Sequence, residues 1–189
     1  SWYDAVEFAN ALSDMLGLSH CYENNNVAPS FSSDITSCPG YRLPTDEEWV
    51  YAARSGTTGH HWTGEGADLG GTFSSGYTSN HFSAITIEDG VNNPSLAEYA
   101  WFCASESNDV AQLLPNGFGL YDMSGNIWEW INDSNPEVDG WKILRGGAWS
   151  YQTEWLAVGA RMGYWPDPNT TQGNLEPNLL GFRLVRTVN

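Results

Sequence analysis

The sequence is poor in positive charge and lacks any long apolar run. Its 189 residues contain 7 Lys and Arg against 23 Asp and Glu, which gives a net charge of −16. A chain this acidic repels nucleic acid and anionic membrane surfaces and favours cations. No stretch approaches the roughly 18 apolar residues that a membrane helix requires. We therefore expect no nucleic-acid partner and no membrane span.

Cysteine is also scarce, and the three present cannot all pair within one chain. Cys21 and Cys38 enclose a short polar loop, and we expect a disulfide between them, as in extracellular proteins. Two free thiols in a cytosolic protein are the alternative. Cys103 follows two aromatic residues, and we predict a buried free thiol there.

Aromatic residues and glycine are abundant instead. The chain has 10 Trp, 9 Tyr, 7 Phe and 20 Gly, and it shows no linker or internal repeat. This composition predicts a single α+β domain over 1–189, irregular in backbone and with an aromatic core.

Two segments carry helix signals. The first, 1–16, places apolar residues near one face and Ser1 at the N-cap. The second starts where Thr45 and Glu48 form a capping box, and it ends before Gly56. The residues expected on or beside the buried faces are Ala5, Val6, Phe8, Ala9, Leu12, Leu16, Trp49, Ala52 and Ala53.

The rest of the chain has little periodicity. Residues 56–98 are rich in Gly, Ser, Thr and Asn, so we expect loops and short strands there. Further short strands are predicted around 126–132, 142–149, 157–162 and 181–187.

The stretch 116–130 combines glycines, aromatics and two carboxylates. Its glycines allow tight turns or positive φ, while Asp122 and Glu129 supply oxygen ligands beside carbonyl groups. The stretch therefore indicates a calcium-ordered loop that leads into a strand. A plain turn before a buried, Trp-rich strand is the alternative.

Five ordered segments resemble the formylglycine-generating-enzyme (sulfatase-modifying factor) domain family. They are 1–6, 40–54, 116–130, 144–149 and 181–186, and their order and rough spacing match over nearly the whole chain. The resemblance implies a variant of the C-type-lectin fold, with two helices and short, twisted antiparallel sheets. It also implies a structural calcium ion, with ligands at Asp122, Met123, Gly125, Ile127 and Glu129.

Members of this family usually carry a segment before the position of Ser1, with strands that pair with the final strand. Without it, the strand around 181–187 would have an open edge, which natural proteins cover. We therefore expect an N-terminal segment beyond this sequence, supplied upstream or by another chain. Secreted bacterial members often have a cysteine-rich insertion near Cys21 and Cys38, which supports the disulfide.

The enzymes of the family bind copper(I) through two cysteines and convert a substrate cysteine to formylglycine. The matching positions here are Tyr151 and Leu156, and copper(I) requires soft thiolates. We therefore expect no copper and no catalytic residues; an oxidase with unfamiliar ligands is the alternative. Iron-dependent relatives use spaced histidines on a helical domain. A zinc site at His60, His61 and Glu65 is less favoured than a chance histidine pair.

Two motifs imitate the sugar-binding signatures of calcium-dependent lectins, at 130–133 and 176–178. Their order along the chain is reversed relative to those lectins. Because motif order sets ligand geometry, we interpret both as coincidence.

Residues 150–178 lie where the family builds its active-site surface, and they mix rigid aromatic with polar side chains, as binding surfaces do. We expect ligand contacts from Tyr151, Trp155, Tyr164, Trp165, Asp167, Asn169 and Asn174. We expect Trp149 to lie in the core, and a core role for about half of the others is the alternative. The leading hypothesis is a noncatalytic, extracellular, calcium-stabilised module that binds a protein or glycan or assembles with itself. The alternatives are an oxidoreductase and a structural subunit of a surface appendage.

Overall fold

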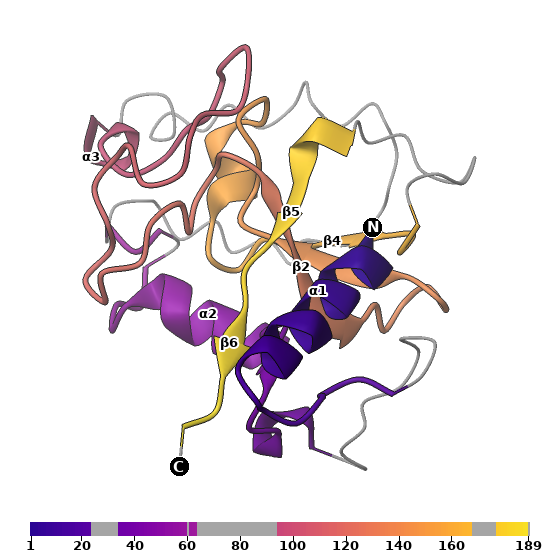
Figure 1. Ribbon diagram of the computed structural model, residues 1–189. Helices are drawn as coiled ribbons and strands as arrows, with labels where there is room; N and C mark the ends of the chain where they lie inside the picture. Colours follow the sequence, from indigo (N-terminus) through magenta and orange to yellow (C-terminus); the bar gives the residue numbers. More distant parts are fainter. Residues whose placement is uncertain (24–33, 60, 64–93, 168–176, 189) are drawn as a thin grey trace.

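A computed structural model describes residues 1–23, 34–59, 61–63, 94–167 and 177–188 (Figure 1). The helical elements are α1 (Trp2–Met15), η1 (Ile35–Ser37), α2 (Asp46–Arg54), α3 (Pro94–Ala97), η3 (Thr153–Leu156) and η4 (Pro177–Leu179). The strands are β1 (Tyr41–Arg42), β2 (Trp128–Ser134), β3 (Lys142–Arg145), β4 (Met162–Tyr164), β5 (Leu180–Phe182) and β6 (Val185–Arg186). None of the helices in these ranges is long and apolar enough to cross a membrane.

Helix α1 begins as predicted, because Ser1 and Asp4 form a capping box. Its buried face is formed by Trp2, Ala5, Val6, Ala9 and Ser13. The expectation that Phe8 and Leu16 belong to this face is wrong, since they are 54% and 56% exposed. The buried face includes Trp2 in place of these two residues. The indole Nε1 of Trp2 donates to the backbone oxygen of Ile131 at 2.8 Å.

Helix α2 also has its predicted start and end. The Thr45 side chain accepts from the Glu48 amide at 3.2 Å, and the Glu48 carboxylate accepts from the Thr45 amide at 2.9 Å. Ser55 ends the helix in the left-handed conformation, with φ of 49°. Trp49 and Ala53 are buried as expected.

The strands form a four-stranded sheet in the order β4-β3-β2-β5 and a separate β1-β6 pair. Strands β2, β3 and β4 pair antiparallel, as predicted. Strand β5 pairs with β2 in parallel, with Trp128 opposite Leu180, so the expectation of purely antiparallel sheets is wrong for this pair. The strand predicted around 157–162 begins only at Met162.

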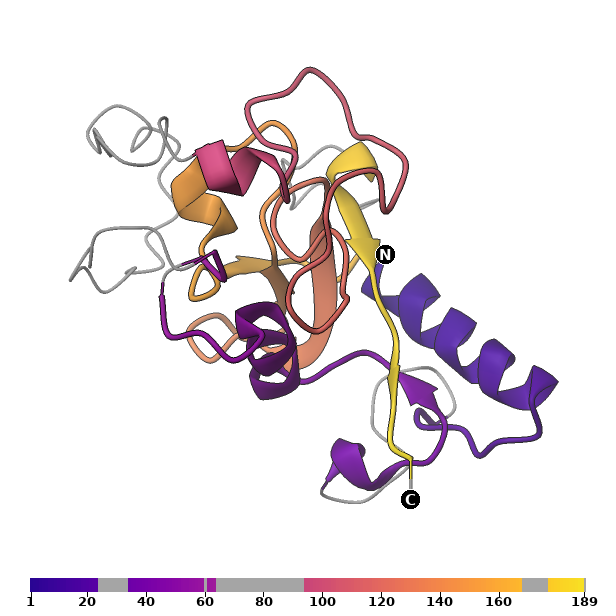
Figure 2. The same cartoon turned by 90° about the vertical axis from the view of Figure 1, so that its left-hand side faces the viewer.

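The predicted final strand is divided between two sheets. In Figures 1 and 2 the chain runs from β5 past α1 to β6. Strand β6 pairs with β1, with Tyr41 opposite Arg186, so this part of the chain end already has a partner. Strand β5 is the outer strand of its sheet among the described residues.

The core is aromatic, as the composition predicts. Its largest fully buried side chains include Trp49, Trp128, Trp130 and Tyr164. A disulfide joins Cys21 and Cys38, which confirms the predicted pair. Both bonded cysteines are fully buried, with 0% exposure.

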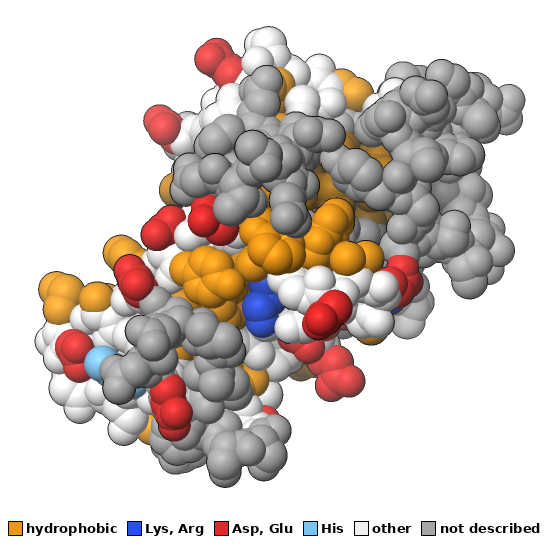
Figure 3. Space-filling view, turned by 90° about the vertical axis from the view of Figure 1, so that its right-hand side faces the viewer, with side chains coloured by type: hydrophobic (Ala, Val, Ile, Leu, Met, Phe, Trp, Pro, Cys, Tyr) orange, Lys and Arg blue, Asp and Glu red, His pale blue; other side chains and the backbone are white. Residues whose placement is uncertain are grey.

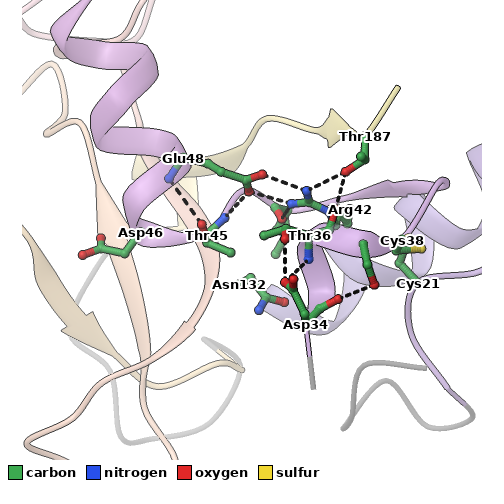
Figure 4. A network of polar contacts seen from close by, with 12 residues as sticks. Cys21, Asp34, Thr36, Cys38, Arg42, Thr45, Asp46, Glu48, Asn132 and Thr187 are labelled. Carbon is green, nitrogen blue, oxygen red and sulfur yellow. Dashed lines mark hydrogen bonds and ion pairs between the residues drawn. A yellow bond between two sulfur atoms is a disulfide. The ribbon is translucent and has the colours of Figure 1, made fainter. Parts of the chain in front are cut away.

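A buried arginine joins the disulfide-bonded region to α2 and the chain end (Figure 4). The Arg42 guanidinium donates to both carboxylate oxygens of Glu48, at 2.6 and 2.8 Å, and to the hydroxyl of Thr187 at 3.2 Å. That hydroxyl in turn donates to the backbone oxygen of Thr36 at 2.5 Å. Burial raises the pKa of Glu48, but hydrogen bonds from Arg42 and Thr45 lower it more, so the pKa lies below its ordinary value.

Candidate functional site

Glu129, the second residue of β2, lies near the end of the stretch 116–130 that the sequence marks as a calcium site. It is 6% exposed, and its carboxylate accepts from the indole Nε1 of Trp49 at 2.7 Å. Arg183 donates to the same carboxylate through Nε at 2.6 Å and through Nη2 at 2.5 Å. Strand β2, helix α2 and the segment after β5 therefore meet at one buried carboxylate.

The backbone before β2 has positive φ at Gly119 and Gly125, as its glycine content predicts, and also at two residues that are not glycine. Asp122, Gly125 and Asn126 have φ values of 54°, 79° and 63°. A Cβ atom at Gly125 would lie 2.1 Å from the backbone oxygen of Trp101, so only glycine fits there. The Asp122 carboxylate accepts from the Ala111 amide at 2.8 Å, which holds the turn against a neighbouring loop.

Two of the backbone oxygens predicted to bind calcium, those of Met123 and Ile127, lie near Gly146. A Cβ atom at Gly146 would lie 3.7 Å from the Met123 oxygen and 4.0 Å from the Ile127 oxygen. The same point is 3.4 Å from the ring of Trp49, which donates to Glu129. Carbonyl and carboxylate oxygens are the ligands that Ca²⁺ prefers. These donors fit the ion that the resemblance implies, and they would hold it chiefly through the backbone.

Arg183 brings two of the predicted ligand residues together. Its Nη2 donates to the backbone oxygen of Asp122 at 3.3 Å as well as to the Glu129 carboxylate. Burial lowers the pKa of Arg183, but the Glu129 charge and hydrogen bond raise it more, so the pKa lies above its ordinary value. Sequence reasoning missed this partner, although the scarcity of basic residues and its place in a matched segment are signals that mark Arg183.

Four of the seven basic side chains make contacts inside the molecule. Arg42, Arg145 and Arg183 each form a two-pronged pair with a carboxylate. Lys142 lies over the ring of Trp2, 4.1 Å from the centroid, and burial lowers its pKa to about 8. Acidic side chains accordingly stand out on the face in Figure 3, around a band of apolar groups. Such a surface attracts cations and basic partners.

An aromatic cluster occupies the region that the sequence marks as a ligand surface. The ring of Tyr151 lies 5.4 Å from that of Trp128 and 6.0 Å from that of Trp155, both in edge-to-face geometry. Tyr151 and Trp155 are half-buried, and both pack against the core. Leu156, by contrast, is completely buried beside Leu96.

Other members of the predicted surface behave differently. Tyr164 is 2% exposed and its ring lies 6.1 Å from that of Trp130, so its assignment to the ligand surface is wrong. It lies on β4, where the alternating side chain points into the core. Trp165 and Asp167 are half-buried. Asn169 and Asn174 lie outside the described residues. Trp149 packs against the core, as expected.

Cys103 is exposed, so the prediction of a buried thiol is wrong. It has a φ of 48°, and its amide donates to the Tyr151 oxygen at 3.1 Å. This backbone turn directs the thiol outward, with Sγ 3.7 Å from the same oxygen. The thiol thus lies beside one of the two positions that carry copper ligands in the family.

The remaining candidate sites gain no support. The apparent sugar motif at 130–133 is used internally: Asp133 accepts from the Asp46 amide at 2.9 Å, and Asn132 accepts from the Tyr22 hydroxyl at 3.2 Å. The zinc candidate lies mostly outside the described residues. Glu176, the first residue of the 176–178 motif, lies outside them too. Within the part of the chain that the structure describes, no three or more His, Cys, Asp and Glu side chains form a metal-binding group.

The profile of the Sulfatase-modifying factor enzyme 1-like domain matches residues 1–188. A formylglycine-generating enzyme of Streptomyces coelicolor is 33% identical over 165 residues, 76% of this chain and 46% of the relative. An inactive C-alpha-formylglycine-generating enzyme 2 of Mus musculus is 32% identical over 150 residues, 76% of this chain and 42% of the relative. The structure of Treponema denticola variable protein 1 superposes with a TM-score of 0.67 at 28% identity, covering 97% of this chain and 68% of that one. The chain spans about half the length of the curated relatives that it matches.

Proposed function

From the family to which this chain belongs, that of the Sulfatase-modifying factor enzyme 1-like domain, we propose that the protein is a noncatalytic, extracellular, calcium-stabilised module for binding or assembly. The observation that carries the proposal concerns the two positions of the copper ligands. Leu156 is fully buried in an apolar cluster, and Tyr151 packs against Trp128. Neither side chain supplies the thiolate that copper(I) requires.

This chain is similar to a relative named as an enzyme and to one named as inactive, which supports a family fold that is kept when catalysis is lost. The relative named as inactive is 32% identical to this chain, and the one named as an enzyme is 33% identical. Overall similarity therefore does not separate the two classes, and the proposal rests on the residues at positions 151 and 156. The disulfide supports an oxidising location outside the cytosol.

The half-buried aromatic side chains of 150–178 form the proposed contact surface for a protein or a glycan. Tyr151 and Trp155 are half-buried and pack on the ring of the buried Trp128, which limits the entropy that they would lose on binding. A glycan array probed with the wild-type chain and with Trp155→Ala tests the glycan form of this proposal. Signals that the substitution abolishes would support it, whereas signals that the substitution leaves unchanged would place the contact elsewhere.

Assembly through the outer strand β5 is the proposed form of a protein contact. Among the described residues no strand pairs with its outer edge, which suits an added strand from an upstream segment or from another copy of the chain. Sedimentation velocity over a hundredfold range of concentration measures self-association directly. A monomer at every concentration would exclude assembly between copies.

Metal analysis and an oxygen-uptake assay on the purified chain test the proposed absence of oxidase activity. Elemental analysis is expected to find no stoichiometric copper or iron. A thiol peptide incubated with the copper-loaded chain is expected to consume no oxygen beyond the rate with free copper and to form no aldehyde. Stoichiometric copper together with enzyme-dependent oxygen uptake would refute a noncatalytic role.

An oxidoreductase is the second candidate, and the position of Cys103 favours it. Its exposed thiol lies next to Tyr151, where the family has a copper-binding cysteine. One thiolate is half of the two-cysteine site of those enzymes. If oxygen uptake were found, Cys103→Ser should abolish it; activity that survived this change would require other ligands.

A further inference from the structure

Arg183 contacts the Glu129 carboxylate, which the proposed calcium site uses, and backbone oxygens beside that site. Its Nη2 is within 2.5 Å of a Glu129 carboxylate oxygen, 3.3 Å of the Asp122 backbone oxygen and 3.1 Å of the Tyr121 backbone oxygen. The guanidinium therefore already places a positive charge beside these oxygen atoms. Its side chain is only 24% exposed, so water screens this charge weakly.

The Glu129 carboxylate has little capacity left for a metal ion. An ionised carboxylate offers about four lone-pair positions. Nε and Nη2 of Arg183 and Nε1 of Trp49 already occupy three of them. Calcium can therefore gain only one further contact from this carboxylate, and it must approach a neighbouring positive charge to make it.

We propose that Arg183 sets the strength of calcium binding in this loop. It holds Glu129 and the turn at Asp122 together when calcium is absent, and its charge keeps the affinity weak. The expected dissociation constant is in the range of extracellular calcium modules, roughly 10⁻⁴ to 10⁻³ M. This inference rests on the calcium site of the proposed function and adds the residue that controls it.

The test is the melting temperature of the full chain as calcium is raised from zero, in chelator, to 10 mM. In Arg183→Gln the charge is lost but a hydrogen-bond donor remains. Its calcium-free melting temperature should fall by on the order of 10 °C, because a buried carboxylate loses its partner. Its half-maximal response to calcium should occur at a concentration at least tenfold lower than in the wild type. Arg161→Gln, at an exposed arginine, is the control and should match the wild type.

Arg183→Lys keeps the charge and loses the two-pronged geometry, so it separates charge from shape. Its half-maximal calcium concentration should stay near that of the wild type. If Arg183→Gln does not fold in chelator, refolding rescued by calcium would support the proposal. Failure to refold at any calcium concentration, or a tenfold change in Arg183→Lys, would overturn it.

The outcomes distinguish this inference from the calcium site itself. Equal half-maximal concentrations in the wild type and Arg183→Gln would remove the role of Arg183 and leave the calcium site standing. No response to calcium in either protein would reject the calcium site, and the inference with it. A response only in Arg183→Gln would support the inference and show that Arg183, without calcium, stabilises the loop of the wild type.

Discussion

Removal of the Cys21–Cys38 disulfide should lower the stability of the folded chain by about 3 kcal/mol. The two cysteines are 17 residues apart, and the bond limits the conformations of this loop in the unfolded state. For a loop of this length the chain-entropy estimate is about 3 kcal/mol at 25 °C. In a chain of this size, that loss corresponds to a fall of about 6–12 °C in melting temperature.

The double variant Cys21→Ala/Cys38→Ala measures this loss by urea unfolding followed by circular dichroism. Cys103→Ser is the matched control, because it removes an exposed thiol and should leave the midpoint unchanged. Both bonded cysteines have 0% exposure, so dithiothreitol alone should leave the bond intact, as mass spectrometry would show, and should reduce it readily only in urea. A double variant with the wild-type midpoint would refute the entropic reasoning.

Two further perturbations test the packing around the site. Stability should fall as pH drops below 4.5, the ordinary pKa of Glu48, because the folded-state pKa of this group is lowered by Arg42 and its contribution is lost on protonation. In Glu48→Gln this part of the acid dependence should vanish in urea titrations between pH 3 and 6; an unchanged slope would assign it to other carboxylates. Gly125→Ala should cost about 2–4 kcal/mol, because φ is 79° and the added Cβ would lie 2.1 Å from a backbone oxygen. Gly159→Ala, where nothing lies within 4 Å, should change the urea midpoint little, and equal losses in both variants would contradict this account.

Local signals account for the parts of the fold that could be predicted. Both helices start at capping boxes, in which the side chain and the amide that it caps are three residues apart. The stretch before β2 has positive φ at Gly119 and Gly125, which its glycine content predicts, whereas the positive φ of Asp122 and Asn126 was not predicted. The disulfide was predictable for a different reason, because three cysteines leave few ways to pair.

Side-chain direction was the main source of error along the chain. Phe8 lies in the predicted helix, but the buried face runs through Trp2, and Phe8 is left 54% exposed against the ring of Phe182. Leu16 follows the last residue of the helix and is 56% exposed. Tyr164 has the character of a surface aromatic, but its position on β4 directs it into the core against Trp130. Residue type did not decide these positions, because the neighbouring element determines which face is covered.

The sequence by itself determined the family, the two helices, the disulfide and the loss of cysteine from the two copper positions. These follow from short-range chemistry and from the order of matched segments. Only the tertiary structure decided that Arg183 pairs with Glu129, 54 residues away, and that Cys103 lies beside Tyr151, 48 residues away. The physical reason is that these contacts depend on the path of the chain: the parallel pairing of β5 with β2 carries Arg183 to the buried carboxylate. No local pattern in the sequence encodes that pairing.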